Sequence, residues 1–161
     1  MSTSVDTKRV KGRRDLHYNS YDDLLEDIRQ LAETPHHTVG NWSLAQIVEH
    51  LSKAAAIQVD GAPFKLPWPT GLLMRTFMKK RFLTKPLPSG FKIPQKHSDQ
   101  FVPADDTDLS QAIEHLESEI ARCQETIQCA PHPVLGNLTS AEWEQFNLRH
   151  AEMHMSFVVE D

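Results

Sequence analysis

The sequence has few cysteines and no long hydrophobic run, and each shortage excludes a class of protein. Its two cysteines, Cys123 and Cys129, form no CxxC pair and are too few for a disulfide framework. No apolar stretch approaches the roughly 20 residues that cross a bilayer. The basic residues near the N-terminus precede no apolar run, so we expect no secretory signal and a cytoplasmic protein.

Acidic residues are absent from one long part of the chain. Although the net charge is −5, the segment between Gly61 and Ser98 holds eight lysines and arginines and no aspartate or glutamate. Such a segment can attract an anionic small molecule or a nucleic acid, or it can be a solvated surface that balances acidic helices. No nucleic-acid-binding motif accompanies the charge, which favours the solvated surface. We therefore expect neither a nucleic acid nor a membrane as partner.

Length and composition predict one folded domain. A chain of 161 residues with 39% hydrophobic and 24% charged residues has the size and composition of a single soluble domain. The polar residues 1–18 predict a flexible N-terminal tail, and the periodic hydrophobic pattern begins at Ser20. We therefore place the single domain at residues 19–161.

Hydrophobic periodicity predicts four long helices and no strand. The first helix spans residues 20–34, and the third spans 108–128 with Cys123 and Ile127 on its core face. Two further helices with amphipathic stripes follow the capping signals described below. Four amphipathic helices without strand-like alternation predict an all-α fold, a four-helix bundle.

Capping boxes mark the starts of the second and the fourth helix. Ser43 is followed three residues later by Gln46, and Thr139 is followed three residues later by Glu142. In each box the two side chains satisfy free backbone N–H groups of the first helical turn. Trp42, just before the first box, is placed to pack on that turn as a hydrophobic staple. These starts define which faces of the two helices are buried.

The connection between the second and the third helix is long, basic and rich in proline. Residues 62–106 hold seven of the ten prolines, and residues 70–83 within them predict a short basic amphipathic helix. A connection of this length is often a lid or a partner surface. Plain packing over one end of the bundle is the commoner role for its aromatic residues.

Three histidines lie where the helix patterns require apolar side chains. His50 lies on the apolar face of the second helix. His150 and His154 are four residues apart on the apolar face of the fourth helix, so their Cβ atoms lie about 5–6 Å apart. Three neutral imidazoles can hold a divalent ion and leave it an open coordination position, as in catalytic sites. The alternative is that each is a core histidine hydrogen-bonded within the protein.

The nearby carboxylates and the other histidines do not extend this set. Glu152 lies about 200° around the helix from His150, and Glu49 about 100° from His50, so neither points at an ion in the site. We therefore expect no general base beside it. Further histidines in loops or beside a hydrophobic stripe are interpreted as surface residues: His36, His37, His97, His115 and His132.

The order and spacing of three motifs resemble the DinB/YfiT-like superfamily. The similarity covers the chain from about residue 20, and its nearest branch is one of unknown function. Relatives often carry a further histidine just before the last ligand, where this chain has Met153. The three motifs are Trp42-Ser-x-x-Gln-Ile-Val-x-His50-Leu, Gly136-x-Leu-Thr-x-x-x-Trp143 and Leu-Arg-His150-x-x-x-His154.

This resemblance implies a fold and a site. The fold is an up-down-down-up four-helix bundle, which is often a homodimer. The site is a divalent ion, Zn, Ni or Fe, held by histidines that match His50, His150 and His154. Some relatives are thiol S-transferases that use a low-molecular-weight thiol, and many have no assigned activity.

Two classes of function follow from these observations. A metal-dependent enzyme would use the ion as a Lewis acid, and either hydrolysis or thiol transfer on a small-molecule substrate fits. A non-catalytic, metal-stabilised bundle that acts as a binding or stress-response module is the alternative. The missing general base favours this alternative, and the open coordination position argues against it. Three imidazoles suit Zn, Ni, Cu and Fe alike, so the ligand set does not select one metal.

Overall fold

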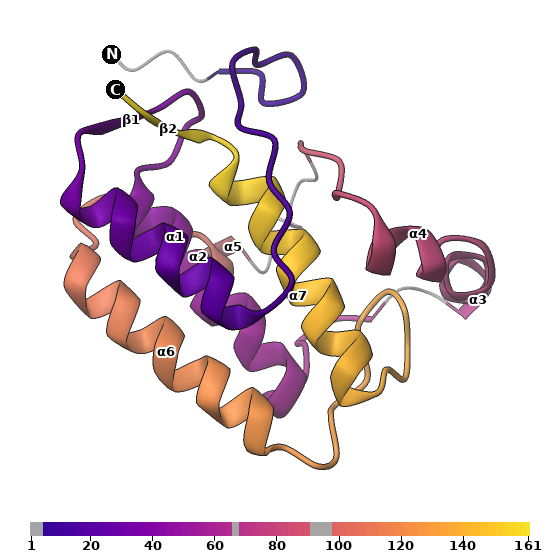
Figure 1. The fold of residues 1–161 in the computed structure, drawn as a ribbon. Helices are drawn as coiled ribbons and strands as arrows, with labels where there is room; N and C mark the ends of the chain where they lie inside the picture. The colour runs from indigo at the N-terminus through magenta and orange to yellow at the C-terminus, as the bar shows by residue number, and fades with distance from the viewer. Residues whose placement is uncertain (1–4, 66–67, 91–97) are drawn as a thin grey trace.

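The computed structural model describes residues 5–65, 68–90 and 98–161, and it is mostly helical, as predicted (Figure 1). The long helices lie side by side, and α2 packs against both α6 and α7. The main hydrophobic core takes side chains from each of them. No helix among the described residues combines the length and the apolar character that crossing a membrane requires. The long helices are α1 (Tyr21–Glu33), α2 (Leu44–Asp60), α6 (Leu109–Glu125) and α7 (Ser140–Met155).

Both predicted capping boxes are present. The Ser43 hydroxyl accepts the Gln46 N–H at 3.2 Å, and the Gln46 side chain accepts the Ser43 N–H at 3.0 Å. Thr139 and Glu142 form the same reciprocal pair, at 3.2 and 3.0 Å. Because these bonds satisfy backbone donors at the helix starts, α2 and α7 begin where the sequence predicts. Their histidine-bearing faces are therefore turned toward each other.

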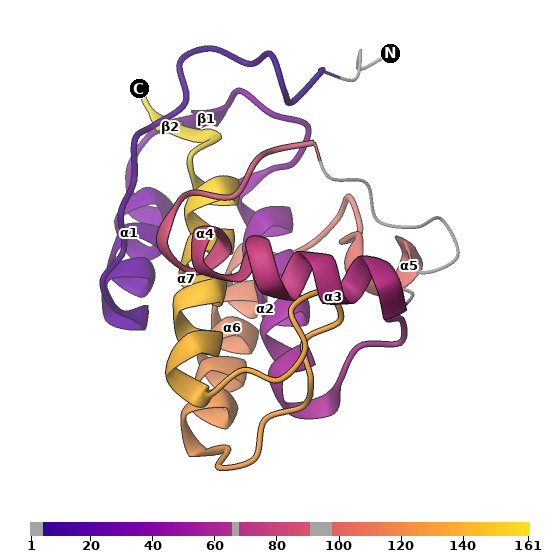
Figure 2. The same ribbon diagram turned by 90° about the vertical axis from the view of Figure 1, so that its right-hand side faces the viewer.

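The connection between α2 and α6 contains several short helices. Two of them, α3 (Trp68–Phe77) and α4 (Lys79–Thr84), replace the single helix predicted over 70–83, and the break between them is at Met78. Helix α4 packs against α7 (Figure 2), and α5 (Ser98–Phe101) leads toward α6. The prediction of one continuous amphipathic helix was therefore wrong in its boundaries, while its helical character is confirmed.

A short antiparallel strand pair corrects the all-α prediction. Strand β1 (His36–Thr38) pairs with β2 (Val158–Glu160), with His36 opposite Glu160. Each strand has three residues, which is too short for an alternating hydrophobic pattern to reveal it. The pair joins the chain just after α1 to the chain just after α7.

Helix α6 ends earlier than its hydrophobic pattern predicts. Its last residue is Glu125, and Thr126 is extended, with its backbone N–H bonded to the Cys123 carbonyl. Cys123 is buried as predicted, at 1% exposure, whereas Ile127 is 99% exposed. The assignment of Ile127 to the core was wrong, because an i, i+4 spacing has meaning only while the helix continues.

Residues just before α1 contact the C-terminal part of α7 and the chain beyond it. The Arg14 guanidinium pairs with Asp27 at 2.7 Å and donates to the Val158 carbonyl at 2.6 Å. Tyr18 is buried at 5% exposure, and its backbone N–H donates to Glu152 at 2.7 Å. The segment that composition predicts as a tail is anchored at these residues.

Candidate metal centre

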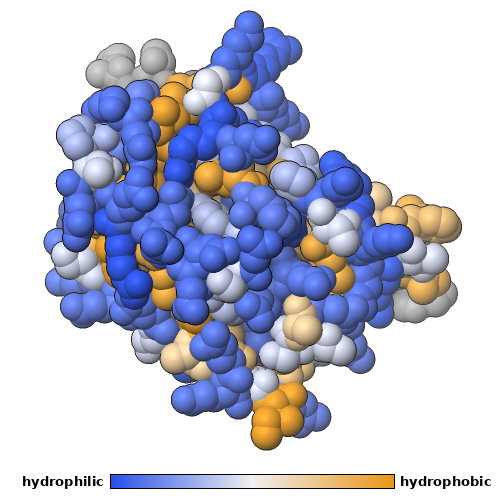
Figure 3. Space-filling view, viewed as in Figure 1, coloured by the Kyte–Doolittle hydropathy of each residue, from blue (hydrophilic) through white to orange (hydrophobic). Residues whose placement is uncertain are grey.

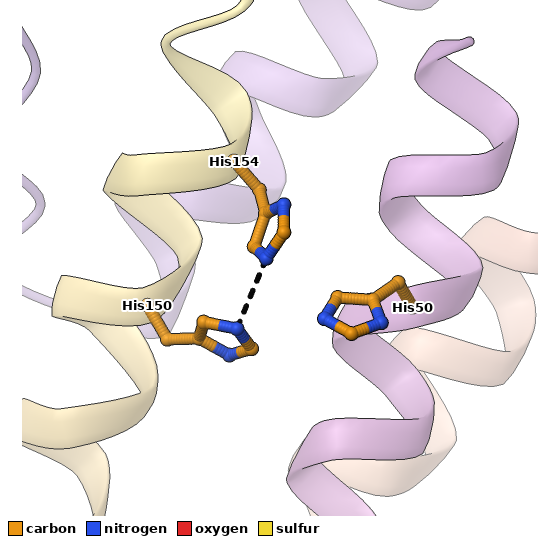
Figure 4. Close-up of side chains that lie close together, drawn as sticks. All are labelled: His50, His150 and His154. Atoms are coloured by element: carbon orange, nitrogen blue, oxygen red, sulfur yellow. Dashed lines mark hydrogen bonds between the residues drawn. The ribbon is translucent and has the colours of Figure 1, made fainter. Parts of the chain in front are cut away.

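Helices α2 and α7 bring His50, His150 and His154 together, as Figure 4 shows. One ring nitrogen of each histidine lies within 4.8 Å of the corresponding nitrogen of the other two. The ring centroids are 5.2 Å apart for His50 and His150, 4.6 Å for His50 and His154, and 4.7 Å for His150 and His154. The histidine triad that the sequence proposes as a ligand set is thus a compact cluster in space.

The local sequence explains why the cluster forms. His150 and His154 are one helical turn apart, so both side chains leave α7 on the same side. Their Nε2 atoms are 3.0 Å apart. His50 reaches the same space from the facing helix α2 and is 5% exposed. Two helices, α2 and α7, therefore supply all three rings.

His50 is oriented by the connection that follows it. Its Nδ1 is 2.8 Å from the carbonyl oxygen of Phe101, the last residue of α5. Since a carbonyl oxygen can only accept, Nδ1 carries the proton and Nε2 presents its lone pair. A hydrogen bond of this kind on the far nitrogen is typical of metal-binding histidines, because it sets the tautomer and the ring orientation.

All three imidazoles are held neutral. Burial lowers the pKa of His150 to about 3. Burial is also the leading cause of the lowered pKa values of His50 and His154, and positive charge on neighbouring groups adds to it. Neutral imidazole is the form that binds a metal, because the lone pair is free.

The donor set fits a divalent ion. At 3.0 Å, the Nε2 atoms of His150 and His154 either share one proton or both direct lone pairs at a common cation. The second arrangement uses the His50 lone pair as well. Three nitrogen donors leave at least one coordination position for another ligand, since zinc sites commonly hold four.

Aromatic side chains surround the triad. Trp42 stacks on His154 with 5.5 Å between centroids and an interplanar angle of 13°, and it lies 4.9 Å from His50. Phe146 lies 6.2 Å from His150 at an angle of 26°. The sequence assigned Trp42 only a staple at the start of α2 and missed its contact with two site histidines. The signal that pointed to it was its place in the first motif, eight residues before His50.

The nearby carboxylates are engaged elsewhere, as the helix geometry predicts. Glu49 contacts His115 at 2.9 Å and Lys53 at 3.7 Å. Glu152 contacts Arg149 at 2.7 Å and accepts the Tyr18 backbone N–H. Neither has a described contact with the triad, so no carboxylate base stands beside it among these contacts.

The histidines that the sequence assigns to the surface differ in their burial and in the elements that carry them. His132 is buried at 7% exposure, so that assignment was wrong; its Nδ1 accepts the N–H groups of Val134 and Leu135. His115 is partly exposed and pairs with Glu49. His36 and His37 lie in β1 rather than in a loop. His97 lies outside the described residues.

The basic connection covers the outer side of α7. Lys79 of α4 pairs with Glu142 of α7 at 2.7 Å, and Phe82 packs in a second hydrophobic cluster that includes Phe146. Beyond this contact, α3 leaves large apolar side chains in solvent, and orange colour marks that edge of the molecule in Figure 3. They are Leu72, Leu73 and Phe77, which are 49%, 57% and 71% exposed.

Comparison with known proteins gives one clear family relation. The model of a family described as a protein of unknown function, DUF1569, matches residues 10–161. This range includes all three site histidines. No curated protein matches the chain, and no solved structure matches it.

Proposed function

Since the chain belongs to the DUF1569 family of proteins of unknown function, we propose from its site that it is a divalent-metal-binding protein of the DinB-like type. His50, His150 and His154 are the ligands in this proposal, and the ion is Zn, Ni or Fe. The observation that carries it is the convergence of three neutral ring nitrogens within 4.8 Å of one another.

The details of the site support binding over a fortuitous cluster. The Phe101 carbonyl sets the tautomer of His50 so that Nε2 is free. The 3.0 Å contact between the Nε2 atoms of His150 and His154 is satisfied by a shared cation. A core that only needed to be filled would be more stable with apolar side chains at these positions, because buried polar groups cost free energy unless they are paired.

The DinB-like assignment rests on the motifs and on what their residues do. Trp42 and His50 of the first motif meet at the site. Trp143 of the second motif is a buried residue in the first turn of α7, the helix that carries both remaining ligands. We propose that α1, α2, α6 and α7 form the up-down-down-up four-helix bundle of that superfamily. A homodimer and a cytoplasmic location stay predictions of the sequence.

The chemistry of such a site depends on what the protein places around the ion. A bound divalent ion acts as a Lewis acid and lowers the pKa of a coordinated water toward about 7. Trp42 and Phe146 shield the imidazoles from water on two sides. Glu49 and Glu152 are held by cations of their own, so neither is free to take a proton. We propose a metal-dependent hydrolase or a thiol S-transferase that uses a low-molecular-weight thiol and a small-molecule substrate.

A non-catalytic role is the second candidate. The engagement of both neighbouring carboxylates favours it, because many metal hydrolases carry a protein base beside the ion. In that case the ion stabilises the helical body, and the protein acts as a binding or stress-response module.

The first experiment measures metal binding itself. Protein without a histidine tag is stripped of metal and titrated with Zn, Ni and Fe(II), and bound metal is determined by elemental analysis. We expect about one ion per chain and a loss of affinity of at least 100-fold, roughly 3 kcal/mol, in His150→Ala. His132→Asn, a substitution of a buried histidine outside the triad, is the matched control and keeps wild-type affinity. Wild-type protein that binds none of the three metals would overturn the proposal.

The second experiment separates the enzyme from the scaffold. Metal-loaded protein is screened for hydrolysis of simple esters and for transfer of a low-molecular-weight thiol to electrophilic acceptors. Turnover that is lost in His150→Ala supports an enzyme. A gain of many degrees in melting temperature on metal binding, with no turnover on either class, supports the non-catalytic role.

A further inference from the structure

The charge of the proposed site is not balanced by its own ligands. Three neutral imidazoles leave a divalent ion its full double positive charge, whereas a ligand set with carboxylates would reduce it. In a partly buried site this charge is poorly screened. An anionic ligand is therefore favoured over a neutral ligand of similar size close to the ion.

The neighbouring carboxylates do not supply that negative charge. Glu49 is paired with Lys53 and His115, and Glu152 with Arg149. Glu142, near the start of α7, is paired with Lys79. Each of these acids compensates a different cation.

Arg13 adds a positive charge at the C-terminal end of α7, where it contacts residues on both sides of His154. Its Nη2 donates to the Met153 carbonyl at 3.1 Å and to the Ser156 hydroxyl at 2.7 Å, on both sides of His154 in sequence. Its guanidinium lies 4.1 Å over the Phe157 ring.

Unlike its neighbour Arg14, Arg13 has no carboxylate partner among the described residues. Arg14 pairs with Asp27 at 2.7 Å, whereas the described partners of Arg13 are neutral oxygens of Met153, Ser156 and Ser89. A guanidinium has five N–H donors, and these bonds use four, so one N–H on Nη1 has no acceptor among the described residues.

Arg13 is held in this place by two segments of the chain. Ser89, from the basic connection, accepts an Nη1 N–H of Arg13 at 3.2 Å and donates its own hydroxyl proton to the Thr7 carbonyl at 2.9 Å. The N-terminal segment and the end of the connection are thereby tied together through one serine. The arginine is thus a positioned cation, in contrast to a freely moving surface charge.

From this arrangement we propose that the site takes a compact anionic ligand, one whose thiolate or carboxylate group binds the ion while the Arg13 guanidinium balances its charge. The inference rests on the proposed metal site and names the chemical class of its substrate. Arg13 acts on the ligand through charge and through its free N–H. Neutral ligands of similar size gain nothing from it.

Binding of a small anion to the Co(II)-loaded protein tests this. Azide is the anionic probe and imidazole the neutral probe, and the visible absorption of Co(II) reports the binding of each. We expect Arg13→Gln to weaken azide binding by about tenfold, or 1.4 kcal/mol, and to leave imidazole binding unchanged. Arg13→Lys, which keeps the charge, should recover a large part of the azide affinity. Arg9→Gln is the matched control, because Arg9 is an exposed arginine of the same segment paired with Asp6.

The outcomes separate this inference from the proposed function. Unchanged azide affinity in Arg13→Gln, with Co(II) bound as in wild type, overturns the anionic site and leaves the metal site standing. An equal loss of azide and imidazole binding also overturns it, since that result reports a change of shape. Wild-type protein that binds no Co(II) overturns both.

Discussion

The two faces of α7 bury polar side chains in opposite ways. On one face, Arg149 and Glu152 form an ion pair at 2.7 Å, and Glu152 also accepts a backbone N–H. On the other face, the Nε2 atoms of His150 and His154 meet each other at 3.0 Å. The first pair balances its charge within the chain, although Arg149 Nε and Glu152 Oε2 have no hydrogen-bond partner among the described residues. In the proposed function, the second is completed by a cation from outside.

The comparison shows that burial alone does not identify a site. Arg149 and Glu152 are 6% and 2% exposed, and His50 of the triad is 5% exposed, so the two sets are similarly buried. What differs is the pairing: Arg149 and Glu152 each have an opposite charge within the protein, whereas the neutral imidazoles of the triad present lone pairs that a cation can accept. The following predictions test this difference from the largest expected effect to the smallest.

Removing one partner of the balanced pair should cost the most stability. Glu152→Ala leaves the buried Arg149 guanidinium without its counter-charge, and we expect the free energy of unfolding to fall by about 3–5 kcal/mol. Urea denaturation of metal-free protein, followed by circular dichroism, measures it. Glu152→Gln keeps an acceptor for the Tyr18 N–H and should lose less. A Glu152→Ala variant as stable as wild type would show that this face is not a structural pair.

His132 is a further case for this comparison, because it is a buried imidazole whose ring nitrogen accepts hydrogen bonds from the backbone. Its Nδ1 accepts two N–H groups, and burial lowers its pKa to about 3, against about 6.5 in the unfolded chain. Between these values the unfolded state binds more protons, so the stability from neutral His132 is present above pH 6.5 and is lost as pH falls toward 3. From pH 6.5 to 5 the loss is roughly 1.5–2 kcal/mol.

The variant His132→Asn isolates this contribution. Asparagine offers an oxygen to the same N–H groups and does not titrate, so its stability should fall less steeply than that of wild type over this pH interval. Chemical denaturation of both metal-free proteins at several pH values gives the difference. Parallel pH profiles would mean that His132 takes up its proton without unfolding.

Loss of the N-terminal cap of α7 should lower the stability of the whole helix, and so it should not distinguish its two faces. In Thr139→Ala the reciprocal hydrogen bonds with Glu142 are removed, and we expect a loss of about 1 kcal/mol. Thr139→Ser should be close to wild type. Zinc affinity of the folded protein should change less than about threefold, because the histidines lie more than two turns further along the helix. A large fall in zinc affinity would show that the triad depends on the start of α7.

The smallest effect on metal-free stability is expected at the triad. In His154→Leu an imidazole whose ring-nitrogen partner is another histidine of the triad, His150, is replaced by an apolar side chain, and we expect the free energy of unfolding to stay within about 1 kcal/mol of wild type or to rise. Zinc binding should be lost in the same variant. A destabilisation above 2 kcal/mol would show that the histidines serve the core, which removes the contrast between the two faces.

Local patterns were sufficient to predict the triad. Capping boxes define where α2 and α7 begin, and the helical period then determines which residues face inward. His50, His150 and His154 all fall on those inward faces, so their convergence follows from two helix starts. The misplaced end of α6 at Ile127 shows the limit of the same method, because the pattern continues past a residue that is no longer helical.

The surroundings of the triad could not be predicted in this way. Arg13 reaches Ser156 across 143 positions of sequence, and no periodic pattern relates residues so far apart. Its segment is polar and basic, which composition alone makes indistinguishable from a disordered tail. The same limit applies to the β1–β2 pair, which is a long-range contact, and to the burial of His132, which is a loop residue. Neither could be predicted from a periodic pattern.

The contact of the N-terminal segment with the end of α7 has a consequence for how the protein is made. Arg13 is synthesised well before His154, so the complete site does not exist until α7 has been synthesised. Since chains are synthesised from the N-terminus at about 5–20 residues per second, several seconds pass between the synthesis of Arg13 or His50 and the synthesis of α7. A nascent or truncated chain that lacks α7 carries the cation and one imidazole and has no place to hold an ion.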